Sequence, residues 1–334
     1  MLRALLALTL ALAALAAPAQ VASPHAIEIP HWFTETFLDL REDVRDAAKQ
    51  GKRVMLYFGQ DGCPYCSALM QTNFRDPKLV EKTRRHVVAI ALNIWGDREV
   101  TTLEGKPMRE KDLARHMKVQ FTPTLIFLDE KGSVVLRLNG YYPPHRLDAA
   151  LDWVGGRMET KQPFAEYMKT AVKESASERL HDQPFFIGLP HDLRRKPGGR
   201  PLAVLFETNF CSGCDEMHRE GFRRSEVLAE VVKFDVVRLH VGAAVPVTPP
   251  VGKTVMADAW ARTLKVAYTP TIVFFDTNGR EAFRIEAYVR PFHLAGAFAY
   301  VSSGAYAKEP SFQRFLQART EHLRERGQHV DLWK

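Results

Sequence analysis

The sequence predicts an α/β protein with two domains in tandem, each a mixed sheet with helices on both faces. Three observations predict this class: an internal repeat, alternating strand and helix patterns in each copy, and a hairpin signal late in each copy. The chain has 334 residues, of which 46% are hydrophobic and 25% charged, as in ordinary globular domains. This length suits about two domains.

The repeat appears when the chain is shifted by 148 positions. The apolar run 54–58 then falls on 202–206, and a Cys-x-x-Cys motif follows each run. Further along the shift becomes 147, which places Thr-Pro-Thr at 122–124 on Thr-Pro-Thr at 269–271. So many matches in one order indicate a duplicated domain rather than one large fold.

Each copy is expected to run strand, Cys-x-x-Cys helix, strand, polar excursion, helix, Thr-Pro, strand, turn, strand, helix. The first copy adds a leading helix at 36–50 that ends at Gly51, and its last helix is expected at 144–154. The turns Asp-x-x-Gly at 129–132 and 276–279 close hairpins.

Each polar excursion contains Gly-Lys, at 105–106 and 252–253. No G-x-x-x-x-G-K-[ST] pattern includes either pair, so a hairpin turn is favoured over a phosphate loop.

Between and after the copies the composition changes. An amphipathic helix is expected at 164–174, followed by a stretch rich in proline and glycine, and another helix at 311–326 is expected to dock on the second domain rather than bind a partner. The predicted divisions are a signal peptide at 1–19, a first domain at 25–157, a partly helical linker at 158–199, a second domain at 200–306 and a C-terminal helix and tail at 307–334.

The N-terminus is typical of a secretory signal peptide. Arg3 precedes the apolar run 4–17, and small residues follow at Ala17-Pro18-Ala19. An uncleaved anchor is the alternative, but spanning a membrane needs roughly 18 or more apolar residues. We expect an exported protein of the periplasm, where disulfides form, with no stable membrane insertion after signal cleavage.

The chain is basic, with a net charge of +7 and a pI near 9.2. Its basic residues are spread along the sequence, and no basic face with stacking aromatics is evident. A solvated basic surface is therefore predicted, with no nucleic-acid partner.

The only four cysteines form two pairs, Cys63/Cys66 and Cys211/Cys214, each where an apolar strand gives way to a helix. A thiol attacks a disulfide only as thiolate, and a helix N-terminus stabilises an anion. Cys63 and Cys211 are therefore expected to attack, while Cys66 and Cys214, one turn later, are more buried and resolve the mixed disulfide.

A zinc site and structural disulfides are two other uses of such cysteines. A zinc site usually has its second pair some 15–20 residues away, whereas here the pairs belong to different repeats. Structural disulfides typically close longer loops. Redox-active pairs are favoured, with no metal and no cofactor.

Thr122-Pro123 and Thr269-Pro270 place their prolines 60 and 59 positions after the first cysteine of each pair. X-Pro is the only peptide bond where the cis form is cheap. A single Thr-Pro would be an ordinary entry to a strand, but two at matched spacing favour a specific role beside the cysteines.

With these motifs the chain resembles the thioredoxin superfamily twice over, across roughly 36–154 and 201–306. Within it, the sequence is similar to exported SoxW-type thioredoxins and to the C-terminal domain of DsbD. In that family the proline is cis and packs opposite the Cys-x-x-Cys, and the preceding residue pairs with extended substrate. The resemblance thus implies substrate binding at Thr122, Pro123, Thr269 and Pro270.

The resemblance also implies an activity. A protein of this kind is a thiol–disulfide oxidoreductase whose substrates are disulfide-containing exported proteins. The resemblance implies that it acts as a reductase and that a DsbD- or CcdA-type membrane electron donor keeps it reduced. Oxidase or isomerase action stays open, because the residues between the cysteines do not fix the reduction potential. A peptide-binding chaperone or docking module with inert disulfides is the alternative of another class.

The sequence departs from thioredoxin at two places in each copy. Gly62 and Phe210 stand where thioredoxin has Trp before its first cysteine, and Tyr57 and Leu205 stand where it buries an acid. The resolving cysteines therefore inherit no base from the family pattern.

Nearby residues could replace that base. Glu207 and Asp61 are close in sequence, but both are expected to be solvated surface acids. His218 follows Cys214 by four residues, where the first copy has Met70, and it too is expected at the surface.

Overall fold

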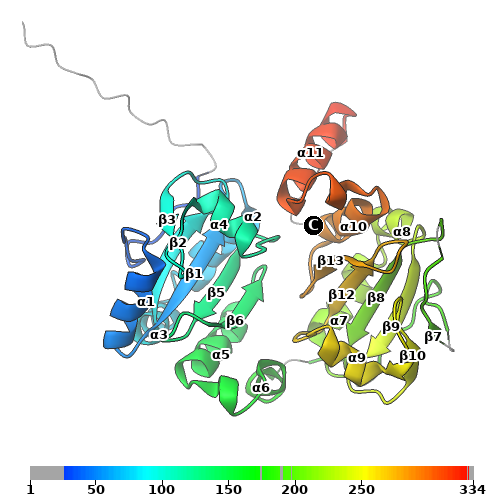
Figure 1. Cartoon of the computed structure of the whole chain (residues 1–334), viewed down its shortest axis with the longest axis horizontal. Coiled ribbons are helices and arrows are strands. Elements are labelled where there is room, and N and C mark those ends of the chain that lie inside the picture. The colour runs from blue at the N-terminus through cyan, green and yellow to red at the C-terminus, as the bar shows by residue number, and fades with distance from the viewer. Residues whose placement is uncertain (1–25, 174, 189–190, 197, 329, 331–334) are drawn as a thin grey trace, which may run out of the picture.

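The computed structural model describes residues 26–173, 175–188, 191–196, 198–328 and 330. The predicted signal peptide lies outside these residues. The described chain forms two α/β units that lie side by side in Figure 1. This is the predicted fold class.

The first unit has a four-stranded mixed sheet in the order β2-β1-β5-β6. In it β1 pairs in parallel with β2 and antiparallel with β5, and β5 and β6 form the predicted hairpin. The strands are β1 (Arg53–Gly59), β2 (Val87–Asn93), β5 (Thr124–Leu128) and β6 (Val134–Asn139). The helical segments are α1 (Leu40–Lys49), α2 (Pro64–Ala68), the π-helical η1 (Leu69–Asn73), α3 (Pro77–His86), α4 (Glu110–His116), α5 (Pro144–Gly155), η2 (Met158–Thr160) and α6 (Phe164–Ala171).

The second unit repeats this topology, with the sheet order β13-β12-β8-β9. Its strands are β8 (Leu202–Glu207), β9 (Asp235–His240), β12 (Thr271–Phe275) and β13 (Glu281–Ile285). Its helical segments are α7 (Ser212–Glu216), the π-helical η3 (Met217–Gly221), α8 (Ser225–Val231), α9 (Ala257–Thr263), α10 (Pro291–Ser302), η4 (Ala305–Ala307) and α11 (Phe312–Glu325). The duplication read from the sequence is thus a duplication of structure.

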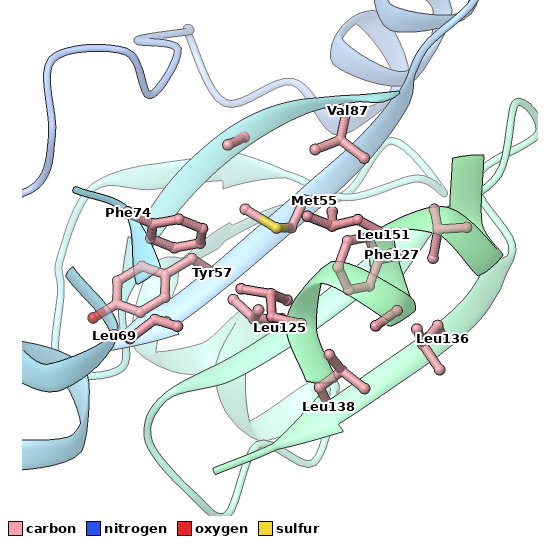
Figure 2. Packing of buried hydrophobic residues seen from close by; sticks show 14 of the residues in the cluster. Met55, Tyr57, Leu69, Phe74, Val87, Leu125, Phe127, Leu136, Leu138 and Leu151 are labelled. Atoms are coloured by element: carbon pink, nitrogen blue, oxygen red, sulfur yellow. The ribbon is translucent and has the colours of Figure 1, made fainter. Parts of the chain in front are cut away.

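The central strands are buried on both faces, because helices cover both sides of each sheet. Every residue of β1 and of β8 is buried. Figure 2 shows one face of the first sheet, where Met55 and Tyr57 of β1 pack with Leu125 and Phe127 of β5 and with Leu151 of α5. Continuous apolar runs are what such doubly covered strands require.

The polar excursions form small sheets of their own. In the first unit β3 (Glu99–Thr101) and β4 (Pro107–Arg109) form a hairpin, and Gly105 in its turn has a φ of 78°. In the second unit β10 (Pro246–Thr248) pairs with β11 (Val255–Met256) and with β7 (His191–Asp192). The hairpin prediction for both Gly-Lys pairs is confirmed.

Two helix boundaries differ from the prediction. The leading helix begins at Leu40 rather than at 36, because Leu38 has a φ of 58° and the Asp39 carboxylate caps the amides of Arg41 and Glu42. The helix expected at 164–174 ends at Ala171, where Val172 turns to an extended conformation.

The segments outside the two sheets pack mainly on the second unit. Phe186, within the predicted linker, forms a bridge with Val236 of β9. Helix α11 packs on α10 through Phe312 and Leu316, as expected of a docked C-terminal helix. The start of α11 also contacts the first unit, where the Gln313 side chain donates to the Gln120 carbonyl at 2.9 Å.

Candidate redox site between the domains

Each cysteine pair lies at the start of a helix that follows a central strand. Cys63 is the N-cap residue of α2, Pro64 is its first residue, and the Cys66 amide donates to Cys63 Sγ at 3.1 Å. Cys211 caps α7 in the same way, and the Cys214 amide donates to its sulfur at 3.1 Å. Both pairs are closed as disulfides.

Burial distinguishes the two sulfurs of each pair. Cys63 and Cys211 are 6% and 7% exposed, whereas Cys66 and Cys214 are 0% and 3% exposed. All four cysteines are buried, and the first cysteine of each pair is the more exposed of the two.

The two Thr-Pro bonds lie beside the cysteines. Thr122–Pro123 and Thr269–Pro270 are both cis. In the first unit the Thr122 carbonyl oxygen lies 3.4 Å from Cys63 Sγ. In the second unit a Cβ built on Gly213 would lie 3.1 Å from the Pro270 ring, so the Cys-x-x-Cys backbone packs closely against that proline.

A cavity of about 960 Å³ lies between the two units. Both candidate sites contribute to its wall, and aromatic side chains are frequent in it. The lining residues include Tyr65, Phe121, Thr122, Tyr142 and Phe164 of the first unit and Phe210, Cys211, Tyr268, Thr269 and Pro270 of the second. Phe210 is 65% exposed, so its ring is available to a bound molecule.

The residue before each Thr-Pro sequence packs into the opposite unit. Phe121 lies within the hydrophobic core of the second unit, 5.4 Å from Phe312 between ring centroids. Tyr268, its equivalent in the repeat, packs 5.6 Å from Phe164 of the first unit and donates its hydroxyl to the Arg137 carbonyl at 2.5 Å. These contacts hold the two candidate sites toward the same space.

The residues between the cysteines also contact the opposite unit. Tyr65 packs edge to face on His293 at 5.4 Å, and burial lowers the pKa of His293 to about 4. The Arg146 guanidinium donates to Ser212 Oγ. Arg146 and His293 are equivalent positions of the repeat, so each unit contacts the other's Cys-x-x-Cys from the start of α5 or α10.

The expectation of solvated surface side chains is wrong for Glu207 and His218. Glu207 is 0% exposed and His218 is 3% exposed, and Glu207 Oε1 lies 2.9 Å from His218 Nε2. The linker covers this pair, since His181 stacks on His218 at 4.8 Å and Phe186 packs edge-on to it. Asp61, by contrast, is exposed as expected.

The described part of the chain has neither a metal-binding cluster of side chains nor a helix that could span a membrane. No group of three or more His, Cys, Asp or Glu side chains is placed there to hold a metal ion. No helix among the described residues has the length and apolarity that crossing a bilayer requires.

The family model of the thioredoxin-like domain matches the chain twice, at residues 40–155 and 194–302. The chain therefore belongs to the thioredoxin-like domain family, and it carries two copies of the domain in tandem. The resemblance inferred from its motifs is confirmed. No curated protein sequence matches this chain.

Solved structures similar to parts of this chain have the thioredoxin fold. A thioredoxin-fold protein from Helicobacter pylori is 26% identical and covers 40% of this chain and 91% of its own, with a TM-score of 0.32. A thioredoxin from Thermus thermophilus is 28% identical over 35% of this chain and 83% of its own, with a TM-score of 0.28. The oxidised C-terminal domain of DsbD from Neisseria meningitidis is 19% identical over 36% and 94%, with a TM-score of 0.27.

Proposed function

We propose that this protein is an exported thiol–disulfide oxidoreductase that exchanges disulfides with protein clients at two sites. In this proposal Cys63 and Cys211 attack, Cys66 and Cys214 resolve, and Thr122, Pro123, Thr269 and Pro270 bind the client backbone. One observation carries the proposal. In both copies a backbone amide donates at 3.1 Å to the first sulfur, which favours that sulfur as thiolate.

The client is proposed to bind in the cavity between the units. Cys211, Thr122 and Thr269 all line this space, and aromatic rings around them can pack against an extended polypeptide. Because Cys63 and Cys211 are nearly covered, a client of protein size needs the two units to move apart slightly.

The exchange activity is tested with the full-length protein and variants lacking either pair, C63S/C66S and C211S/C214S. Reduction of insulin by dithiothreitol should be accelerated by the native protein and by each single-site variant. The variant lacking all four cysteines is the control and should not accelerate it. Equal rates with the native protein and with this control would favour the chaperone alternative, in which the disulfides stay inert.

The direction proposed is reduction, with electrons from a DsbD- or CcdA-type membrane donor. This part rests on the resemblance of the motifs alone. The reduction potential of each single-site variant, measured against glutathione, should lie nearer the roughly −270 mV of thioredoxin than the roughly −120 mV of strong oxidants. Two potentials well above those of glutaredoxins would contradict a reductase.

Isomerase action is the second candidate, because Tyr65 and Thr122 of the first site and Cys211 and Thr269 of the second line one cavity. Reshuffling of client disulfides benefits from two sites that can hold one chain. If the protein is an isomerase, refolding of scrambled ribonuclease should depend on both pairs, and each single-site variant should lose far more than half the native rate.

A further inference from the structure

The second copy buries an ionisable pair behind its Cys-x-x-Cys helix. Glu207 ends β8, and His218 follows Cys214 by four residues in the continuous helical stretch of α7 and η3. Side chains at this spacing lie about one turn apart on the same side of a helix. The His218 ring, 2.9 Å from the carboxylate, therefore connects Glu207 with the turn that carries the resolving cysteine.

The hydrogen bonds fix the roles of the two groups. The Gln183 side-chain amide nitrogen lies 3.0 Å from His218 Nδ1, and an amide nitrogen can only donate. His218 Nδ1 therefore accepts, and His218 Nε2 donates its proton to Glu207 Oε1. The second oxygen, Glu207 Oε2, is buried and makes no hydrogen bond within the described chain. That oxygen is free to take up a proton.

We propose that Glu207, held by His218, accepts the proton of Cys214 when this cysteine resolves a mixed disulfide. The inference rests on the proposed exchange activity of the second site. In the mixed disulfide, Cys211 is bonded to a client sulfur. Cys214 gives its thiol proton to Glu207, and its sulfur attacks Cys211 Sγ. The Cys211–Cys214 bond forms, the client leaves as thiolate with the bonding electron pair, and it takes a proton from solvent.

The first copy is built differently at the same place. Gly59 matches Glu207, and Met70 matches His218. A Cβ built on Gly59 would overlap the Tyr57 hydroxyl, so the tyrosine fills the space that the acid takes in the second copy. Burial raises the pKa of Tyr57 far above its usual value, and the phenol stays neutral. Figure 2 shows its ring between Phe74 and Leu69.

Other charged groups face the pair from neighbouring elements. His181 stacks on His218, and its Nε2 lies 2.6 Å from the Asp215 carboxylate. His240 is the register partner of Glu207 in the sheet, and the Arg238 guanidinium lies over Phe186 and contacts the His181 carbonyl. Protonation of His181 would add a positive charge beside His218. The experiment therefore includes His181→Gln and covers a wide pH range.

The test isolates the second site in the C63S/C66S background and uses Ellman's reagent, which releases one thionitrobenzoate at each of two steps. Attack by Cys211 gives the first phase, and attack by Cys214 on the mixed disulfide gives the second. Glu207→Gln should slow the second phase about a hundredfold at pH 7 and leave the first within about twofold. Above about pH 9 the difference should shrink, because the thiol then ionises without help.

Three further variants make the result specific. Glu226→Gln, an exposed carboxyl on α8, should change neither phase. His218→Gln keeps an amide that can donate to Glu207, so it should retain a second phase within about tenfold, whereas His218→Met should lose most of it. His181→Gln removes the ring that stacks on His218 and should leave the second phase within about twofold. The first phase checks that each variant is folded.

The inference would be overturned if the second phase of both Glu207→Gln and His218→Met were as fast as that of the parent at every pH. The exchange activity of the second site would still stand. A C63S/C66S parent that releases no thionitrobenzoate would overturn both the inference and the exchange activity of the second site. If Glu207→Gln does not fold, the comparison of His218→Gln with His218→Met decides.

Discussion

Asn139 Nδ2 donates to Glu286 Oε2 at 3.0 Å, and these two residues hold equivalent positions in the repeat. A bond between equivalent residues of two copies lies close to the axis that relates them. Each unit also has an equivalent hydrogen bond two positions earlier in the chain. Arg137 donates to the Met117 carbonyl in the first unit, and Arg284 donates to the Leu264 carbonyl in the second. The two domains thus pack face to face around a local two-fold axis, much as the subunits of a dimer do. The cavity between the units is lined by Cys211 of the second pair and by Tyr65, which stands between the cysteines of the first.

The Phe121 ring, which packs in the core of the second domain, is predicted to hold the two domains together. Phe121→Ala should lower the free energy of unfolding by about 3 kcal/mol, because the ring is buried in the core of the other unit. It should also speed alkylation of reduced Cys63, since the units separate more readily. Urea unfolding and iodoacetamide labelling measure the two effects. Phe37→Ala, at a fully exposed ring, should change neither.

Arg146 is predicted to assist the second site from the first domain. Its guanidinium contacts Ser212, directly after Cys211, and a nearby cation favours a thiolate. In the C63S/C66S background, Arg146→Gln should slow the first phase with Ellman's reagent about threefold at pH 7. Arg45→Gln, at an exposed position on α1, is the control. An unchanged rate would mean that the guanidinium serves only domain packing.

His293 is predicted to make stability depend on pH. Burial lowers its pKa to about 4, so between pH 6.5 and 4 the unfolded chain binds a proton that the folded chain does not. The stabilising contribution is complete above pH 6.5 and is lost as the pH falls toward 4. His293→Gln should remove about 2 kcal/mol of the decrease in unfolding free energy between pH 7 and pH 4. His322→Gln, on the exposed side of α11, should retain the full decrease.

The Tyr57 hydroxyl is buried and makes no hydrogen bond within the described chain. Removing a buried polar group that has no partner relieves its desolvation cost. Tyr57→Phe should therefore raise the free energy of unfolding by about 1 kcal/mol, measured with urea. Tyr300→Phe provides the opposite control, since the Tyr300 hydroxyl donates to the Glu309 carbonyl at 2.5 Å and its loss should destabilise the protein. Destabilisation by Tyr57→Phe would contradict this account of the first copy.

The elements near the motifs could be predicted because their signals are local. An apolar run such as 54–58 fits only a strand covered on both faces, and a cysteine followed by Pro64 marks the first turn of a helix. The start of α1 could not be placed, because the left-handed Leu38 and the cap at Asp39 depend on how that segment meets Thr101.

The burial of Glu207 and His218 could not be predicted from the sequence, because it too depends on a distant segment. Glutamate and histidine near a site are usually solvated, and nothing in their own segment indicates otherwise. The cover comes from His181 and Phe186, in a linker that the sequence presents as a connector. The linker reaches Glu207 and His218 because it folds back beside β9, where Phe186 forms a bridge with Val236.

The order of residues alone determined the duplicated thioredoxin-like fold, the two cysteine pairs and their prolines, since strand pattern, helix start and spacing are properties of neighbouring residues. The tertiary structure decided how the two domains face each other, that Phe121 and Tyr268 each pack into the opposite domain, and that Glu207 is buried. These depend on contacts between segments more than 30 residues apart, among them Phe121 on Phe312, Tyr268 on Arg137 and His181 on His218, and no local pattern encodes the packing that selects them.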